Sequence, residues 1–426
     1  MKLKISYLNK LPLFFVFLFS VLYFFQFINL SNGNIVNSYP FITPDGFDWY
    51  LEGIYLYKIL TTSIPLPQLP VLRPPVFVFI NLLDYYFYQS GIILGVIYCL
   101  CIPATFIVID SLIKHSRING NNYGSFYKIP LSLAVTFSPL NFIRPYLLAD
   151  VIACLFALVS VLYCVKYFYF QKNKYLLLFL LFFVLGGLTQ LYALIPLLIF
   201  FPIMLFLSLD TNRIIRVKAI FGISASLLIY LFLLFLWLRA MPHQSTPNTF
   251  LLLKLSMEMF DFYKNIWICF FWPFIFFALI YIRNNTEFFL KNSIIFSALM
   301  VVIFFGVLSF FYQWPESRYT FYLWPWFLLF FFAKVNIPNL ISVIVLSALL
   351  IINFSMAPAN YWQPTWASTS FNIHNIWIVQ FFAADSVDRK ISCTTEECLR
   401  DNLFLSQSNP YINSSVKLMH KLLNEY

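Results

Sequence analysis

Residues 218–238 read KAIFGISASLLIYLFLLFLWL, and this stretch decides the class of fold. Beyond Lys218 it holds no charged side chain. An apolar helix of about 20 residues crosses the roughly 30 Å hydrocarbon core of a bilayer. Long apolar runs of the same kind occur at 11–28 and 338–352. The stretch therefore predicts a membrane-spanning helix, in a chain that has several of them.

The composition of the whole chain agrees with a membrane protein. Of its 426 residues, 61% are hydrophobic and only 10% are charged, whereas a soluble domain carries about 25% charged residues. Segments with the period-2 alternation of a membrane β-barrel are absent, so helices are the remaining way to span a bilayer. The first apolar run has a basic start but no small-residue cleavage site, and we expect an uncleaved helix there.

We therefore expect an all-α, polytopic membrane protein with about eleven transmembrane helices. The transmembrane domain is expected over residues 1–356, and a small extracytoplasmic C-terminal region over residues 357–426. The segments 129–166 and 175–209 each contain a polar break and are read as two helices. The expected helices are 11–30, 90–113, 129–143, 146–166, 175–189, 191–209, 218–238, 266–282, 293–311, 319–333 and 338–356.

The basic residues predict the orientation of these helices. With the N-terminus in the cytoplasm, the cytoplasmic side holds fifteen of the 27 Lys and Arg residues but three of the 17 Asp and Glu residues. Each cytoplasmic loop obeys the positive-inside rule. The net charge of +10 thus reports topology rather than nucleic-acid binding. The cytoplasmic loops are 1–10, 114–128, 166–174, 210–218, 283–292 and 334–337.

Three sizeable segments are expected on the outer side: 31–89, 239–265 and 357–426. The first is proline-rich and amphipathic, and we expect it to lie on the membrane surface. The last is the most polar part of the chain and holds Cys393 and Cys398, which an oxidising compartment would permit to pair. The other cysteines lie in apolar helices and are expected to be inert core residues. They are Cys99, Cys101, Cys154, Cys164 and Cys269.

Carboxylates in the first outer segment are candidates for acid–base chemistry. Asp45 and Asp48 lie among aromatic residues, and Glu52 follows closely. Aromatic residues hold a segment at the membrane interface, and a carboxylate in such a half-dry place has a raised pKa and can act as a general base. A solvated loop is the competing interpretation.

Two arginines at outer helix ends are candidates for binding an anion. Arg144 precedes Asp150 at the junction of the third and fourth expected helices, where a structural ion pair is the alternative. Arg318 lies with Glu316 and Tyr319 in a short outer loop, where a charged turn is the alternative. Arginine suits bidentate recognition of phosphate.

Other features of the sequence carry less chemistry. Gln190 lies in a polar break that a simple helix interruption explains. The four histidines show no metal-ligand spacing, and no nucleotide-binding glycine motif occurs. A divalent metal is possible but not indicated, and no cofactor is expected with certainty.

The order of these motifs resembles that of the GT-C membrane glycosyltransferases, which include protein O-mannosyltransferases and aminoarabinose transferases of bacterial envelopes. The resemblance covers residues 1–335. It rests on the acidic first outer loop, on Arg73-Pro74-Pro75 at the entry to the next membrane segment, on Ser138-Pro139 through to Asp150, and on Arg318-Tyr319. One departure is that Gly46, rather than a second acid, follows Asp45.

The resemblance implies an inverting sugar transfer from a polyprenyl-phosphate donor to an extracytoplasmic acceptor, which is a glycolipid, a polysaccharide or a protein. Asp45 or Asp48 would be the base, and Arg144 and Arg318 would hold the lipid phosphate. Glu52, Arg73, Asp150, Glu316, Tyr319 and Gln190 would support them. The expected location is a bacterial inner membrane, with membrane lipids as further partners. A flippase or transporter for lipid-linked sugars, and an O-antigen polymerase or ligase, are the alternatives.

Overall fold

The computed structural model of this chain is helical apart from one sheet of two short strands, over the residues that it describes. The all-α expectation is thus confirmed for that part of the chain. The described residues are 10–31, 44–62, 65–87, 92–116, 125–136, 149–207, 213–245, 273–276, 293–309, 322–335, 337, 339–356, 415, 417–419 and 421–422.

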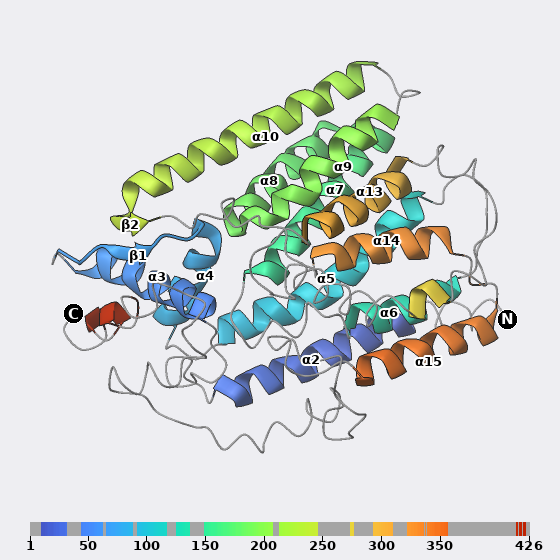
Figure 1. Cartoon of the computed structure of the whole chain (residues 1–426), viewed down its shortest axis with the longest axis horizontal. Helices are drawn as coiled ribbons and strands as arrows, with labels where there is room; N and C mark the ends of the chain where they lie inside the picture. The colour runs from blue at the N-terminus through green and yellow to red at the C-terminus, as the bar shows by residue number, and fades with distance from the viewer. Residues whose placement is uncertain are drawn as a thin grey trace.

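Three of the described helices are long and apolar enough to cross a membrane. They are α5 (Ile92–Ser116), α7 (Asp150–Phe170) and α10 (Arg213–Ala240). Helix α10 lies along an edge of the helix bundle (Figure 1), and large apolar side chains on it, among them Phe221 and Leu228, are exposed. A continuous row of exposed apolar side chains marks a surface that contacts a membrane or a partner. The chain is therefore a membrane protein.

Further helices pack around these three, close to the ranges expected from the sequence. The eleven-helix count stays a prediction, because only 273–276 is described within the expected helix 266–282. The other helices of the bundle are α2 (Leu11–Ser31), α6 (Lys128–Thr136), α8 (Asn173–Thr189), α9 (Leu194–Leu207), α13 (Ser293–Ser309), α14 (Trp324–Lys334) and α15 (Leu340–Met356).

Local backbone conformation explains the boundaries around α8. Gln171 takes the left-handed conformation (φ 53°) after α7, and its N–H donates to the Tyr167 carbonyl, which ends that helix. Gln190 is extended and ends α8. A 3₁₀ turn, η5 (Leu191–Ala193), then leads into α9. The expected break inside 175–209 is therefore present at Gln190.

The described part of segment 31–89, which is expected on the outer side, is folded into defined elements, and its position at the membrane surface stays a prediction. It forms α3 (Pro44–Thr61), strand β1 (Leu69–Val71) and α4 (Pro75–Tyr86). Strand β1 pairs in parallel with β2 (His243–Ser245), which follows α10, with Leu69 opposite His243. These elements gather at one end of the helix bundle (Figure 1). The sequence did not predict the sheet, since each strand has only three residues.

The C-terminal region is described at a few residues only. Leu418, Met419 and Leu422 are buried in the main hydrophobic core, so this part of the tail is anchored to the rest of the chain. Cys393 and Cys398 lie outside the described residues, and their pairing stays a prediction. Four of the other cysteines are buried free thiols, as expected: Cys99, Cys101, Cys154 and Cys164.

Candidate functional site

The site begins with two buried carboxylates on α3. Asp48 and Glu52 lie four residues apart and therefore on the same side of the helix. Their exposed fractions are 2% and 1%. Burying carboxylates is costly unless charges or hydrogen-bond donors face them, so this pair requires a partner from another element.

Arg73 is that partner, and it lies between β1 and α4. Its backbone N–H donates to both carboxylate oxygens of Glu52, at 3.0 and 2.9 Å. Its guanidinium Nη2 lies 3.2 Å from Oδ2 of Asp48, as a hydrogen-bonded ion pair. The following residue is Pro74, and a residue before proline is biased to extended backbone. One arginine thus engages both carboxylates, one through its main chain and the other through its side chain.

The end of α10 holds the same residue from its carbonyl side. The indole Nε1–H of Trp237 donates to the Arg73 carbonyl at 2.8 Å. Pairing of β1 with β2 adds a bond from the Leu69 N–H to the Pro242 carbonyl. The peptide groups of Arg73 are therefore fixed on both sides, by α3 and by α10.

The electrostatics of the two carboxylates differ. Burial raises the pKa of Glu52 well above its usual value, and the Asp48 charge adds to this. The Arg73 N–H and its positive charge act in the opposite direction but are smaller effects. The protonated form of Glu52 is thus favoured by folding, while Asp48 carries the ion pair.

Close packing of α3 against α4 holds the two segments that carry the cluster together. The Asn81 amide donates to the Phe77 carbonyl at 2.9 Å and to the Trp49 carbonyl at 3.4 Å. The rings of Trp49 and Phe77 meet edge to face with centroids 5.2 Å apart. Gly53 faces Asn81 so closely that an added Cβ would lie 2.7 Å from the Asn81 Cβ. Only glycine fits at this crossing.

A second polar group lies where α7 begins. Tyr322 donates its hydroxyl to Asp150 Oδ1 at 2.5 Å, and both residues are buried. The ring of Tyr192, in η5 just after Gln190, lies 6.2 Å from the Tyr322 ring. This group therefore joins the start of α7, the α8–α9 break and the segment before α14.

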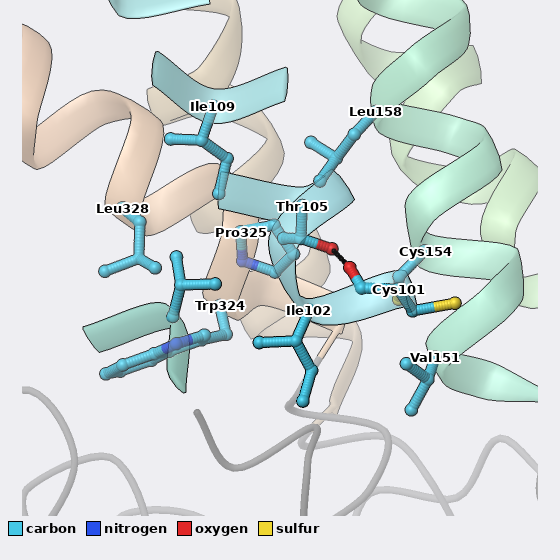
Figure 2. Close-up of a pocket in the computed structure, with 11 residues that line it drawn as sticks. Cys101, Ile102, Thr105, Ile109, Val151, Cys154, Leu158, Trp324, Pro325 and Leu328 are labelled. Atoms are coloured by element: carbon cyan, nitrogen blue, oxygen red, sulfur yellow. Dashed lines mark hydrogen bonds between the residues drawn. The ribbon is translucent and has the colours of Figure 1, made fainter. Parts of the chain in front are cut away.

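A small cavity lies between α5, α7 and α14 (Figure 2). Its volume is about 20 Å³, which is room for about one water molecule. Apolar side chains of α5, α7 and α14 line it, and the Thr105 hydroxyl is already bonded to the Cys101 carbonyl at 2.7 Å. A sugar does not fit, so the cavity is a packing gap and not a substrate site.

The structure brings some of the expected site residues together and leaves others undescribed. Asp48, Glu52 and Arg73 form one cluster, and Asp150 bonds Tyr322. Asp45 is described only as a position in the first turn of α3, one turn before Asp48. Arg144, Glu316, Arg318 and Tyr319 lie outside the described residues.

The sequence analysis missed Trp237, Asn81 and Tyr322 as parts of these groups. A tryptophan at the end of an apolar helix is ordinarily an anchor at the membrane interface. Nothing in the sequence therefore indicated that Trp237 bonds to Arg73. Asn81 lies within an otherwise apolar run, 75–83, and that was the one signal available. Among the described residues, no group of three or more His, Cys, Asp or Glu side chains could hold a metal ion.

A scan against protein-family models, a search of curated proteins and a search of solved structures find no match to this chain.

Proposed function

We propose that this chain is an inverting membrane glycosyltransferase that uses a polyprenyl-phosphate sugar and an extracytoplasmic acceptor. The observation that carries the proposal is the buried Asp48–Arg73–Glu52 cluster. It joins the acidic segment and the arginine–proline–proline segment, which are two of the motifs whose order resembles the GT-C transferases. A purely structural loop would not require two carboxylates at 2% and 1% exposure.

The cluster favours Asp45 over Asp48 as the base. Asp48 is 2% exposed and the Arg73 guanidinium already contacts its Oδ2 at 3.2 Å, so an acceptor hydroxyl would have to displace that contact. Asp45, one turn earlier on α3, would take the proton of the acceptor hydroxyl. The hydroxyl oxygen then bonds the anomeric carbon, and the bond from that carbon to the phosphate oxygen breaks with its electron pair. The configuration at this carbon is thereby inverted.

Arg144 and Arg318 would receive the departing phosphate. The Asp150–Tyr322 hydrogen bond supports this role, since it joins the two described segments that directly follow these arginines. Charge-assisted bonds to a leaving phosphate typically lower a barrier by a few kcal/mol. Gln190, Glu316 and Tyr319 would complete the surroundings.

The proposal includes an orientation. The N-terminus would lie in the cytoplasm of a bacterial cell. About eleven helices, an odd number, would then place the C-terminus outside the inner membrane, on the same side as the cluster. The positive-inside distribution supports this orientation.

The test is sugar transfer by the purified full-length chain from radiolabelled polyprenyl-phosphate sugars. We expect Asp45→Asn to lower turnover per folded molecule by about a hundredfold or more, the usual scale for a general base. The matched control is Asp110→Asn. Asp110 is also a buried carboxylate, but it lies on α5, away from the cluster, and it is hydrogen-bonded to Tyr127 and to Lys114. Lipid translocation without a new glycosidic bond would instead favour a flippase. Equal turnover of both variants and the unaltered chain would remove Asp45 from the reaction.

A further inference from the structure

A concentration of positive charge lies where α7 ends and where α8 and α10 begin. Tyr167, Ile215 and Ala219 form a small buried core there, with Tyr175, Leu176 and Leu205 packed against it. Six basic residues occupy the same helix ends, and we call them the basic corner: Lys166, Lys172, Lys174, Arg213, Arg216 and Lys218.

The two helices α8 and α10 run parallel, so their N-termini lie at the same end. A Cβ added to Gly222 would meet Leu176, near the start of α8, and one added to Gly187 would meet Tyr230, further along α10. Each helix N-terminus carries a partial positive charge of about half a unit. Neither helix has an acidic residue in its first turn.

This arrangement opposes the usual electrostatic preference of helices. Basic side chains at a helix N-terminus are unfavourable, and acidic ones are favourable. The nearest acid in the sequence is Asp210, which lies outside the described residues. Nε of Arg216 is buried and has no hydrogen-bond partner among the described residues. Among the described residues, the basic corner therefore presents an excess of positive charge that an anion would neutralise.

The surface beside the corner is apolar and distinguishes a lipid from a soluble anion. Ile214 and Phe221 on α10 are 63% and 72% exposed, and Leu177 on α8 is 65% exposed. They alternate with the cations along the same helix turns. A molecule that carries both an anionic head and hydrocarbon chains fits both surfaces, whereas inorganic phosphate fits only one.

We propose that the basic corner binds an anionic phospholipid of the surrounding bilayer. The headgroup phosphate lies between the first turns of α8 and α10, and the acyl chains lie along the exposed apolar sides of those helices. Basic pockets between membrane helices recognise anionic headgroups in this way. This inference does not rest on the glycosyltransferase proposal, because the corner is built from other residues.

The experiment measures binding of phosphatidylglycerol to the purified full-length chain by native mass spectrometry, with phosphatidylcholine as the neutral comparison. The test variant is Lys172→Gln/Lys174→Gln/Arg213→Gln. The control, Lys10→Gln/Lys58→Gln/Lys128→Gln, removes the same charge from the residue before α2, from α3 and from α6. We expect the test variant to bind phosphatidylglycerol about tenfold or more weakly, given the usual contribution of each basic residue near anionic lipid. The control should bind like the unaltered chain.

Three outcomes would overturn the proposal. The first is that the test variant keeps its affinity for phosphatidylglycerol. The second is that both variants lose this affinity equally. The third is that inorganic phosphate displaces the lipid, which would make the corner a site for soluble anions. A second measurement needs no variant. Phosphatidylglycerol with a photoreactive headgroup should label peptides that contain 166–177 and 213–221 of the unaltered chain, and labelling elsewhere would contradict the proposal.

Discussion

Arg73 joins α3 to α10, two helices that lie far apart in sequence. Its N–H contacts Glu52, its guanidinium contacts Asp48, and its carbonyl accepts a bond from Trp237. The guanidinium also lies 5.9 Å from the centroid of the Trp49 ring, within the range of a cation–π contact. A change at any of these contacts therefore tests one face of the same residue.

Replacing Trp237 by Phe tests the carbonyl face. The variant keeps an aromatic ring against Phe79 but loses the donor to Arg73. We expect a loss of about 1–2 kcal/mol of stability, because a half-buried carbonyl loses a hydrogen-bond donor. Thermal unfolding in detergent measures it.

Trp326→Phe is the matched control for loss of ring area. The Trp326 ring packs on Phe200 with centroids 5.3 Å apart, and its indole makes no hydrogen bond to other described residues. If both variants lose the same stability, the bond from Trp237 contributes nothing beyond packing.

Glu52 makes the folded chain sensitive to pH. Burial raises its pKa above that of the unfolded chain, so folding takes up a proton. This contribution is fully present below the unfolded pKa and is lost as pH rises through the folded pKa. As the pH rises above the usual pKa of a glutamate, the melting temperature of the unaltered chain should therefore fall more than that of Glu52→Gln. Parallel curves for the two proteins would show that Glu52 does not titrate in this range.

Helices α3 and α4 approach each other closely at Gly53. Among the described glycines, an added Cβ would have its shortest contact there, at 2.7 Å. Its neighbours within 3 Å of an added Cβ include backbone atoms of Asn81 and Leu82, and backbone cannot turn aside as a flexible side chain does. The crossing of the two helices therefore depends on the absence of a side chain at this position.

Gly53→Ala should force the two helices apart and destabilise the protein by about 1–3 kcal/mol, as overpacking commonly does. Gly186→Ala is the control, because the nearest atom to its added Cβ is 3.6 Å away, an ordinary contact. Alanine is also the better helix former at that position. Melting temperatures of the two variants separate the effects, and an unchanged value for Gly53→Ala would mean that α3 and α4 pack more loosely.

For the whole molecule, the predicted orientation rests on charge. A reporter that is active only outside the cytoplasm, fused after Tyr426, should give signal, and one fused after Ala240 should give it too. Fusions after Ser116 and Phe170 should be silent, since these helix ends lie beside Lys114 and Lys172. A silent reporter at Tyr426 would mean that the number of spans is even.

The sequence predicted the described bundle helices well because their apolar runs are long. It did not predict α3 and α4 as helices, since segment 31–89 is proline-rich, has no long apolar run and was expected to lie on the membrane surface. Nor did it predict the full burial of Asp48, Glu52 and Asn81 within these helices. Only the tertiary partners of these residues make their burial possible, and those partners lie up to 32 positions away. Arg73 is in turn held by Trp237, 164 positions further along the chain. The residue types of the site were therefore predictable, while their pairing was not.

The bond between Arg73 and Trp237 also sets an order of events during synthesis. These residues are 164 positions apart, and a ribosome adds about 5–20 residues per second, so roughly 10–30 s separate their appearance. Until the end of α10 and strand β2 have been synthesised, Arg73 lacks the indole donor and β1 lacks its partner strand. The cluster on α3 is thus completed late, when more than half of the chain has already been translated.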